Sequence, residues 1–109
     1  MRKRLRSFKF AGNGIRLLIA HEHNAWIHCF AAVCVTIAGC WLGLSTTEWI
    51  AVVFAIAMVL AAEAVNSSIE ALADLVSPDY NEAIKRTKDL AAGAVLILAI
   101  GAAIIGLII

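Results

Sequence analysis

Charged side chains are scarce in this sequence, and their scarcity is the first constraint on its class. Only 16% of the 109 residues are Asp, Glu, Lys or Arg, whereas 62% are hydrophobic. A soluble domain of this size needs more polar surface than that. The composition therefore favours a single domain, residues 1–109, embedded in a membrane.

Proline and cysteine are also sparse, and their positions are informative. The single proline, Pro78, follows Ser77 in a turn signal that ends a helical pattern running to Val76. The cysteines include no Cys-x-x-Cys pair, so neither a zinc site nor a disulfide framework is indicated. We interpret them as small apolar side chains of a membrane span: Cys29, Cys34 and Cys40.

The sequence does contain three long uncharged runs, at residues 26–44, 49–62 and 90–109. A bilayer core about 30 Å thick is crossed by roughly 20 helical residues, which the first and third runs supply. The second run is shorter, but its helical pattern continues to Val76. We therefore predict an all-α integral membrane protein with transmembrane helices at residues 26–44, 48–76 and 88–109.

Basic residues gather near the N-terminus and between the last two spans. Arg2, Lys3, Arg4, Arg6, Lys9 and Arg16 lie at the start, and Lys85, Arg86 and Lys88 lie after the second span. The connection between the first two spans has no Lys or Arg. Because cytoplasmic loops carry an excess of basic residues, we expect a multi-pass protein whose N-terminus and loop 77–87 are cytoplasmic.

An amphipathic pattern precedes the first span. Apolar residues recur at helical spacing, opposite Lys9, Asn13 and Arg16; they are Phe8, Ala11, Ile15, Leu18 and Ile19. This pattern predicts a surface helix at about residues 7–21, lying in the cytoplasmic interface.

Acidic residues recur along one face of the second predicted span. At about 100° per residue, Glu63, Glu70 and Asp74 project within a narrow sector together with Ser67, and Asn66 lies beside them. Counting about 1.5 Å per residue along the span places Glu63 roughly 21 Å into the membrane. An ionised carboxylate at that depth costs several kcal/mol, so Glu63 is a functional candidate that must be protonated, paired or reached by water.

The acidic face suits a hard divalent cation such as Mg²⁺, which prefers carboxylate oxygens and would bring a polyphosphate with it. Glu22 lies just before the first span, at the depth of Glu70, and so belongs to the same layer. In the loop, Lys88 offers a point charge for phosphate, and Asp89 offers a further oxygen ligand or an orienting partner.

Other interpretations of the same residues remain open. Buried carboxylates can form a proton or ion pathway, and the glycine-rich third span could be the contact surface of an assembly subunit. A protonated Glu63 could also make a helix contact with Asn66. The histidines do not form His-Glu-x-x-His, so a zinc protease is excluded and interfacial hydrogen bonding is expected of them; they are His21, His23 and His28.

The whole pattern resembles the prokaryotic diacylglycerol kinase family, which includes the undecaprenol kinases. The motif is Glu63-x-x-Asn66-Ser67-x-Ile69-Glu70-x-x-x-Asp74 followed by Lys88-Asp89, with further matches at Gly14-Ile15-Arg16, Glu22 and Cys40-Trp41-Leu42. The resemblance implies an ATP-dependent lipid kinase of the bacterial cytoplasmic membrane. It also implies a homotrimer whose active sites are shared between neighbouring subunits, and no nucleic-acid partner is expected.

The resemblance also implies a role for each matching residue. Glu63 would be the general base that takes the proton from the lipid hydroxyl. Glu22 and Glu70 would hold Mg²⁺ and so the ATP phosphates, supported by Asn66. Further nucleotide contacts are implied for Asp79, Tyr80, Asn81, Lys88 and Asp89, and lipid contacts for Arg16 and Trp41.

Some positions depart from the best-known diacylglycerol kinases. Ala92 stands where they carry a serine, Phe10 where they carry a tyrosine, and Lys3 where they carry an arginine. Glu48-Trp49 and the segment from Lys88 to Gly93 look closer to the undecaprenol kinases. The expected lipid alcohol is therefore either diacylglycerol or undecaprenol.

Overall fold

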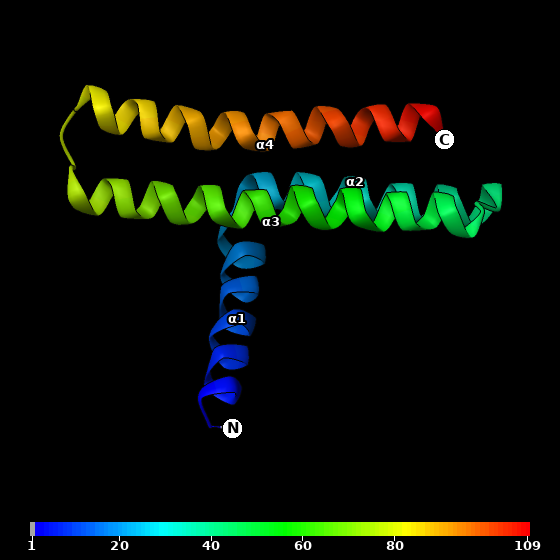
Figure 1. Ribbon diagram of the computed structural model, residues 1–109, viewed down its shortest axis with the longest axis horizontal. Helices are drawn as coiled ribbons and strands as arrows, with labels where there is room; N and C mark the ends of the chain where they lie inside the picture. Colours follow the sequence, from blue (N-terminus) through cyan, green and yellow to red (C-terminus); the bar gives the residue numbers. More distant parts are fainter. Residues whose placement is uncertain (1) are drawn as a thin grey trace.

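The computed structural model describes residues 2–109 as four helices: α1 (Arg2–His21), α2 (His23–Leu42), α3 (Thr46–Val76) and α4 (Glu82–Ile108). α3 is the central element, because it contacts each of the other three. Figure 1 shows α2, α3 and α4 running alongside one another, with α1 leaving them at a steep angle. α2, α3 and α4 are each long and apolar enough to cross a membrane, which confirms the predicted number of spans.

Local capping sets the boundary between α2 and α3. Gly43 ends α2 with a φ of 70°, in the left-handed region that glycine adopts without strain. The Ser45 side chain accepts a hydrogen bond from the Glu48 backbone N–H, and the Glu48 carboxylate accepts one from the Ser45 N–H. This capping box satisfies two N–H groups at the start of α3, so the helix begins at Thr46, slightly before the predicted residue 48.

The start of α4 differs most from the sequence prediction. The helix begins at Glu82 rather than at residue 88, because the Asn81 side chain caps it by accepting hydrogen bonds from the backbone N–H groups of Ala83 and Ile84. The prediction placed the boundary where the apolar run begins, but the charged turns before it are helical too. Lys88 therefore lies on a helix, and the connection after α3 is only residues 77–81.

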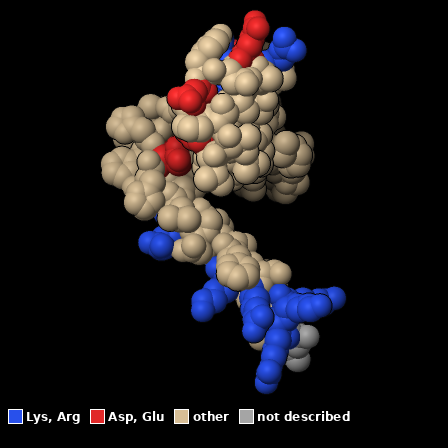
Figure 2. All heavy atoms as spheres, turned by 90° about the vertical axis from the view of Figure 1, so that its left-hand side faces the viewer, with Lys and Arg blue, Asp and Glu red and all other residues tan. Residues whose placement is uncertain are grey.

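α1 is longer than predicted, since it begins at Arg2 rather than at residue 7. None of the side chains of Arg2–His21 is buried, and its basic residues gather toward the end away from the bundle (Figure 2). The indole N–H of Trp26 in α2 donates to the carbonyl of Ile19, which helps to fix the bend between α1 and α2. The direction of α1, steep to the spans, is compatible with a helix lying on a membrane surface.

α3 is longer than a bilayer requires. Its 31 residues extend roughly 46 Å at about 1.5 Å per residue, against a hydrocarbon core of about 30 Å. In Figure 1 the α3–α4 hairpin extends beyond the start of α2. α3 therefore has length to spare, and its polar C-terminal turns and the start of α4 extend past the start of α2.

Gly39 lies where α2 comes very close to the α2–α3 turn. A Cβ atom added there would lie 2.8 Å from Leu44 Cδ1 and 2.8 Å from Trp49 Cη2. We expect Gly39→Ala to lower the free energy of unfolding by about 1–3 kcal/mol, because the rigid indole must move. Thermal denaturation in detergent measures the change.

Gly101→Ala is the matched control for this substitution. No heavy atom outside the helix's own turn lies within 4 Å of a Cβ added at Gly101. Since alanine favours helix over glycine, this variant should keep or raise the melting temperature. Equal melting temperatures for the two variants would contradict the close approach at Gly39.

Candidate active site

Glu63 is the most deeply buried ionisable residue of the described chain. Among residues 2–109 two polar side chains are classed as buried, Glu63 with 2% exposure and Asn66 with 9%. The Glu63 carboxylate is paired, since its Oε1 lies 3.1 Å from Nε2 of His28 in α2. The sequence required this carboxylate to be protonated, paired or reached by water, and the structure shows it paired.

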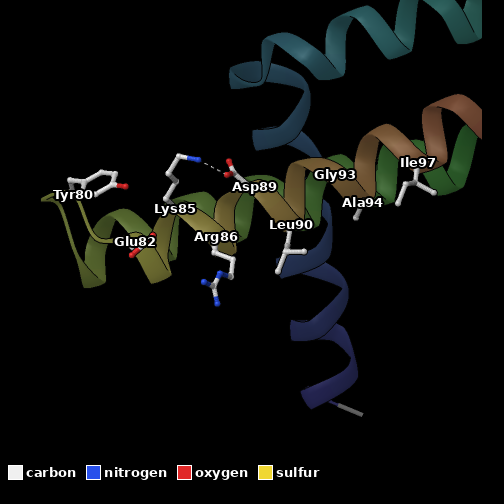
Figure 3. Close-up of a pocket in the computed structure, with 9 residues that line it drawn as sticks. All are labelled: Tyr80, Glu82, Lys85, Arg86, Asp89, Leu90, Gly93, Ala94 and Ile97. Carbon is white, nitrogen blue, oxygen red and sulfur yellow. Dashed lines mark hydrogen bonds and ion pairs between the residues drawn. The ribbon is translucent and has the colours of Figure 1, made fainter.

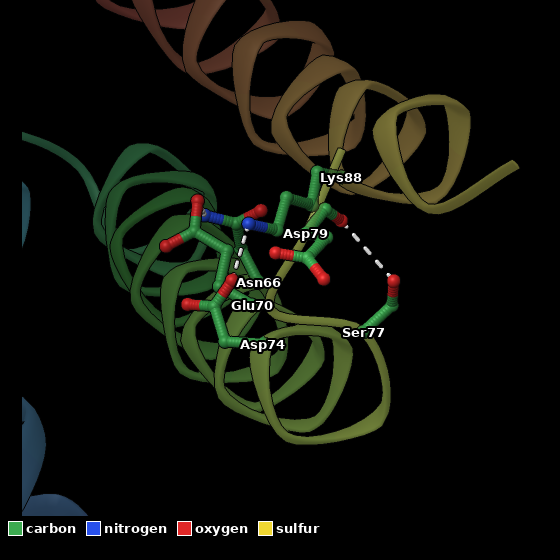
Figure 4. A network of polar contacts seen from close by, with 6 residues as sticks. All are labelled: Asn66, Glu70, Asp74, Ser77, Asp79 and Lys88. Carbon is green, nitrogen blue, oxygen red and sulfur yellow. Dashed lines mark hydrogen bonds and ion pairs between the residues drawn. The ribbon is translucent and has the colours of Figure 1, made fainter. Parts of the chain in front are cut away.

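The polar row continues along α3 toward the hairpin. The Asn66 amide donates a hydrogen bond to Oε1 of Glu70, at 3.4 Å, and Figure 4 shows Asn66, Glu70 and Asp74 along α3. Asn66 Oδ1 and Ser67 Oγ are buried without a hydrogen-bond partner in the part of the chain that the structure describes. Buried oxygens are rarely left unpaired, so these two are available to a water, a cation or a substrate group.

Lys88 reaches from α4 to the acidic face of α3, where it pairs with Asp74. Its Nζ lies 2.5 Å from Oδ1 of Asp74, and Figure 4 shows the pair bridging the two helices. The Asp74 side chain is 65% exposed and that of Lys88 is 37% exposed. Exposed ion pairs contribute little to stability, so this one can exchange Asp74 for another anion at low cost.

Asp89 does not share the ion pair of Lys88. Its Oδ2 lies 2.7 Å from Nζ of Lys85, one turn away on α4. Successive helical residues project about 100° apart, so Lys88 faces α3 while Asp89 faces a shallow hollow that Tyr80 and Arg86 also line (Figure 3). Within residues 2–109 the Asp89 carboxylate therefore pairs with Lys85 and not with Lys88, and its expected role as a further oxygen ligand or an orienting partner stays a prediction.

The connection before α4 has a structural role as well as an exposed face. Asn81 uses its side-chain oxygen to cap α4, and the Asp79 carbonyl accepts a hydrogen bond from the Ser77 hydroxyl. The Tyr80 side chain is 81% exposed. The Asp79 carboxylate, the Tyr80 side chain and the Asn81 amide nitrogen are not used in these hydrogen bonds, so they are candidates for ligand contact.

Glu22 lies at the junction of α1 and α2. It is the N-cap residue of α2 but its side chain makes no capping hydrogen bond, and it is half-buried. Within residues 2–109 no three His, Cys, Asp or Glu side chains come close enough to form a metal site. Within these residues, Glu22 and Glu70 of one chain therefore do not belong to a group of three such side chains around a single metal position.

Besides Glu63, two residues are expected to contact the lipid, and they lie far apart. Arg16 is exposed on α1, where its guanidinium donates to Oδ1 of Asn13. Trp41 is 88% exposed near the C-terminal end of α2, about 20 Å along that helix from His28 at 1.5 Å per residue. Trp41 can therefore contact a lipid tail but cannot reach the atoms next to Glu63 of the same chain.

Sequence reasoning missed His28 as the partner of Glu63. It treated the three histidines alike, as interfacial hydrogen-bonding groups. A signal was present, because His28 is the one imidazole or formally charged side chain within residues 26–44. Asp74 was likewise placed on the acidic face but was not assigned as the partner of Lys88.

Comparisons with known proteins agree with the motif. The family described as Prokaryotic diacylglycerol kinase matches residues 9–109. An undecaprenol kinase from Bacillus subtilis is 38% identical over 104 residues, which cover 95% of this chain and 85% of that protein. A diacylglycerol kinase from a Synechocystis species is 37% identical over 101 residues, covering 92% of this chain and 58% of its own length.

A diacylglycerol kinase from Escherichia coli is 32% identical over 74 residues, covering 68% of this chain and 61% of that protein. The resemblance inferred from the acidic motif is therefore confirmed over nearly the whole sequence. The chain belongs to the prokaryotic diacylglycerol kinase family and is a membrane-embedded lipid kinase of that family.

Proposed function

We propose that the protein transfers the γ-phosphoryl group of Mg-ATP to the hydroxyl of a membrane lipid, either diacylglycerol or undecaprenol. The observation that carries this proposal is the buried, paired carboxylate of Glu63 within a membrane-spanning helix, at the deep end of a polar row. A carboxylate held there is suited to a lipid hydroxyl at headgroup level. The exposed hairpin beyond it is suited to a soluble nucleotide.

Glu63 acts in this proposal as the general base. It takes the proton of the lipid hydroxyl as the lipid oxygen attacks the γ-phosphorus, a contribution of about 10²- to 10⁴-fold to the rate. Glu70 lies two helical turns further on, roughly 10 Å along α3 at 1.5 Å per residue. The base is thus deeper than the phosphate groups, as the depth of a lipid hydroxyl requires.

The oxygen donors near Glu70 fit a magnesium ion. Mg²⁺ is commonly held by one or two carboxylates, with phosphate oxygens and waters completing the shell. Glu22 and Glu70 would supply the carboxylates, and Oδ1 of Asn66, which has no hydrogen-bond partner among residues 2–109, is an additional hard donor. When bound, the cation neutralises charge on the transferring phosphoryl group.

The remaining candidates divide between nucleotide and lipid. Lys88 exchanges Asp74 for a phosphate oxygen, while Asp89 and Tyr80, which share a different face, bind another part of a nucleotide. The nucleotide-contacting set also includes Asp79 and Asn81. Arg16 and Trp41 contact the lipid, with Trp41 restricted to its tail.

We also propose a homotrimer in the bacterial cytoplasmic membrane, with α1 on the cytoplasmic surface. Most residues in the apolar stretches of α2, α3 and α4 are at least partly exposed in a single chain. Neighbouring subunits would cover part of this surface and complete the site around Glu22 and Glu70. The basic residues of α1 and of the start of α4 support the cytoplasmic orientation.

Purified protein supplied with labelled ATP and each lipid separately provides the test. We expect label in at least one lipid, and we expect EDTA to reduce the rate to background and excess Mg²⁺ to restore it, because the phosphate charge is no longer neutralised without the cation. Label in neither lipid, together with ion flux through liposomes without ATP, would instead establish a relay.

A further inference from the structure

His28, the partner of Glu63, has no role in the reaction as described so far. His28 Nε2 lies 3.1 Å from Glu63 Oε1, and the His28 side chain is 25% exposed against 3% for that of Glu63. In residues 2–109 this pair is the one polar side-chain contact between α2 and α3. The His28 imidazole is thus the polar group that contacts the carboxylate of the proposed base.

Other polar groups close to Glu63 do not replace this partner. The Asn66 amide donates to Glu70 instead, and Ser67 Oγ has no partner among the described residues. α4 carries no ionisable side chain from Leu90 to its end. On the α1–α2 side, Glu22 and its flanking histidines precede His28 by more than one helical turn.

A general base must be ionised before it can accept a proton. An ionised carboxylate with almost no solvent contact is costly unless a donor is hydrogen-bonded to it. A charge-assisted N–H···O bond stabilises the ionised form and fixes the direction of the carboxylate. His28 is placed to meet both requirements with a single N–H group, because its Nε2 lies 3.1 Å from one of the two Glu63 oxygens.

We propose that His28 is a positioning residue for Glu63, donating its Nε2–H to Oε1 and leaving Oε2 free for the lipid hydroxyl. This inference rests on the proposed role of Glu63 as base. In the transfer step the lipid O–H bond breaks as its proton passes to Oε2. The lipid oxygen forms a bond to the γ-phosphorus, ADP leaves with the electrons of the broken P–O bond, and the imidazole keeps its proton throughout.

A matched pair of variants tests the donor. His28→Gln places an amide N–H close to the position of Nε2, whereas His28→Met has similar length and no donor. We expect His28→Met to lower kcat about 10- to 100-fold, as the loss of a hydrogen bond to a charged group would do, with the KM for ATP unchanged. His28→Gln should recover at least about a third of the wild-type kcat, since it restores the N–H.

Three results would each overturn the proposal: a wild-type kcat in His28→Met, an equal loss of kcat in both variants, or a change confined to KM. Glu63→Gln measured in parallel separates the two levels: an inactive Glu63→Gln with a fully active His28→Met removes the role of His28 alone. An active Glu63→Gln removes the proposed base itself.

A measurement on the folded wild-type protein covers the case in which His28→Met does not fold. With ¹⁵N-labelled histidine, NMR should show a slowly exchanging Nε2–H signal for His28 that shifts in Glu63→Gln. A rapidly exchanging signal, or one that is unaffected by Glu63→Gln, would contradict the hydrogen bond.

Discussion

Glu63→Gln should lower the rate of lipid phosphorylation by about 10²- to 10⁴-fold, the usual contribution of a general base. The amide has the shape of the carboxylate and keeps an oxygen that can face Nε2 of His28, so the contact between α2 and α3 should be retained. It cannot take up a proton from the lipid. Initial rates with labelled ATP measure the loss, and circular dichroism in the same detergent checks the helices.

Glu48→Gln is the matched control, because the same change is made in the first turn of the same helix. Glutamine also serves at this position of a capping box, so α3 should keep its start and the enzyme its rate. A normal rate in Glu63→Gln would remove the assignment of this residue as base, whichever lipid is supplied.

Glu70→Ala should reduce kcat/KM for ATP by at least about 10²-fold with either lipid. The substitution removes a proposed magnesium ligand and leaves the Asn66 amide without its acceptor, and losses of 10- to 100-fold are typical even when only a supporting partner of a metal ligand is removed. A magnesium titration at fixed ATP measures the effect. The half-saturating concentration of Mg²⁺ should rise together with the fall in rate.

The control for Glu70→Ala is again at Glu48, this time as Glu48→Ala. That variant lacks the acid in the first turn of α3 but leaves the polar row intact, so its magnesium dependence should equal that of the wild type. An unchanged magnesium titration in Glu70→Ala would contradict the metal role without affecting the case for Glu63.

The elements that the sequence predicted well are those that depend on local properties. Three apolar runs are enough to identify three spans, and the turn at Pro78 correctly ends α3 at Val76. The start of α4 was predicted too late, because the charged residues before the apolar run were assumed to lie outside the helix. The cap at Asn81 is a local signal as well, and it identifies the boundary once the charged turns are allowed to be helical.

Contacts between helices could not be predicted in the same way. The pairing of His28 with Glu63 depends on how deeply α2 lies against α3, and no sequence spacing encodes that register. The acidic face of α3 was visible because its members belong to one helix. The separation of Lys88 from Asp89 follows from helical geometry and would have been predicted had α4 been started at Glu82.

The length of α3 has a consequence for the setting in which the enzyme works. Seventeen residue steps separate Thr46 from Glu63, which fixes the proposed base about 26 Å along the helix at 1.5 Å per residue. The height of a lipid hydroxyl varies instead with acyl-chain length, because bilayers differ in thickness by several ångströms. In the proposed reaction the helix holds the Glu63 carboxylate at a fixed height. Membrane thickness therefore determines how closely the lipid hydroxyl can approach that carboxylate.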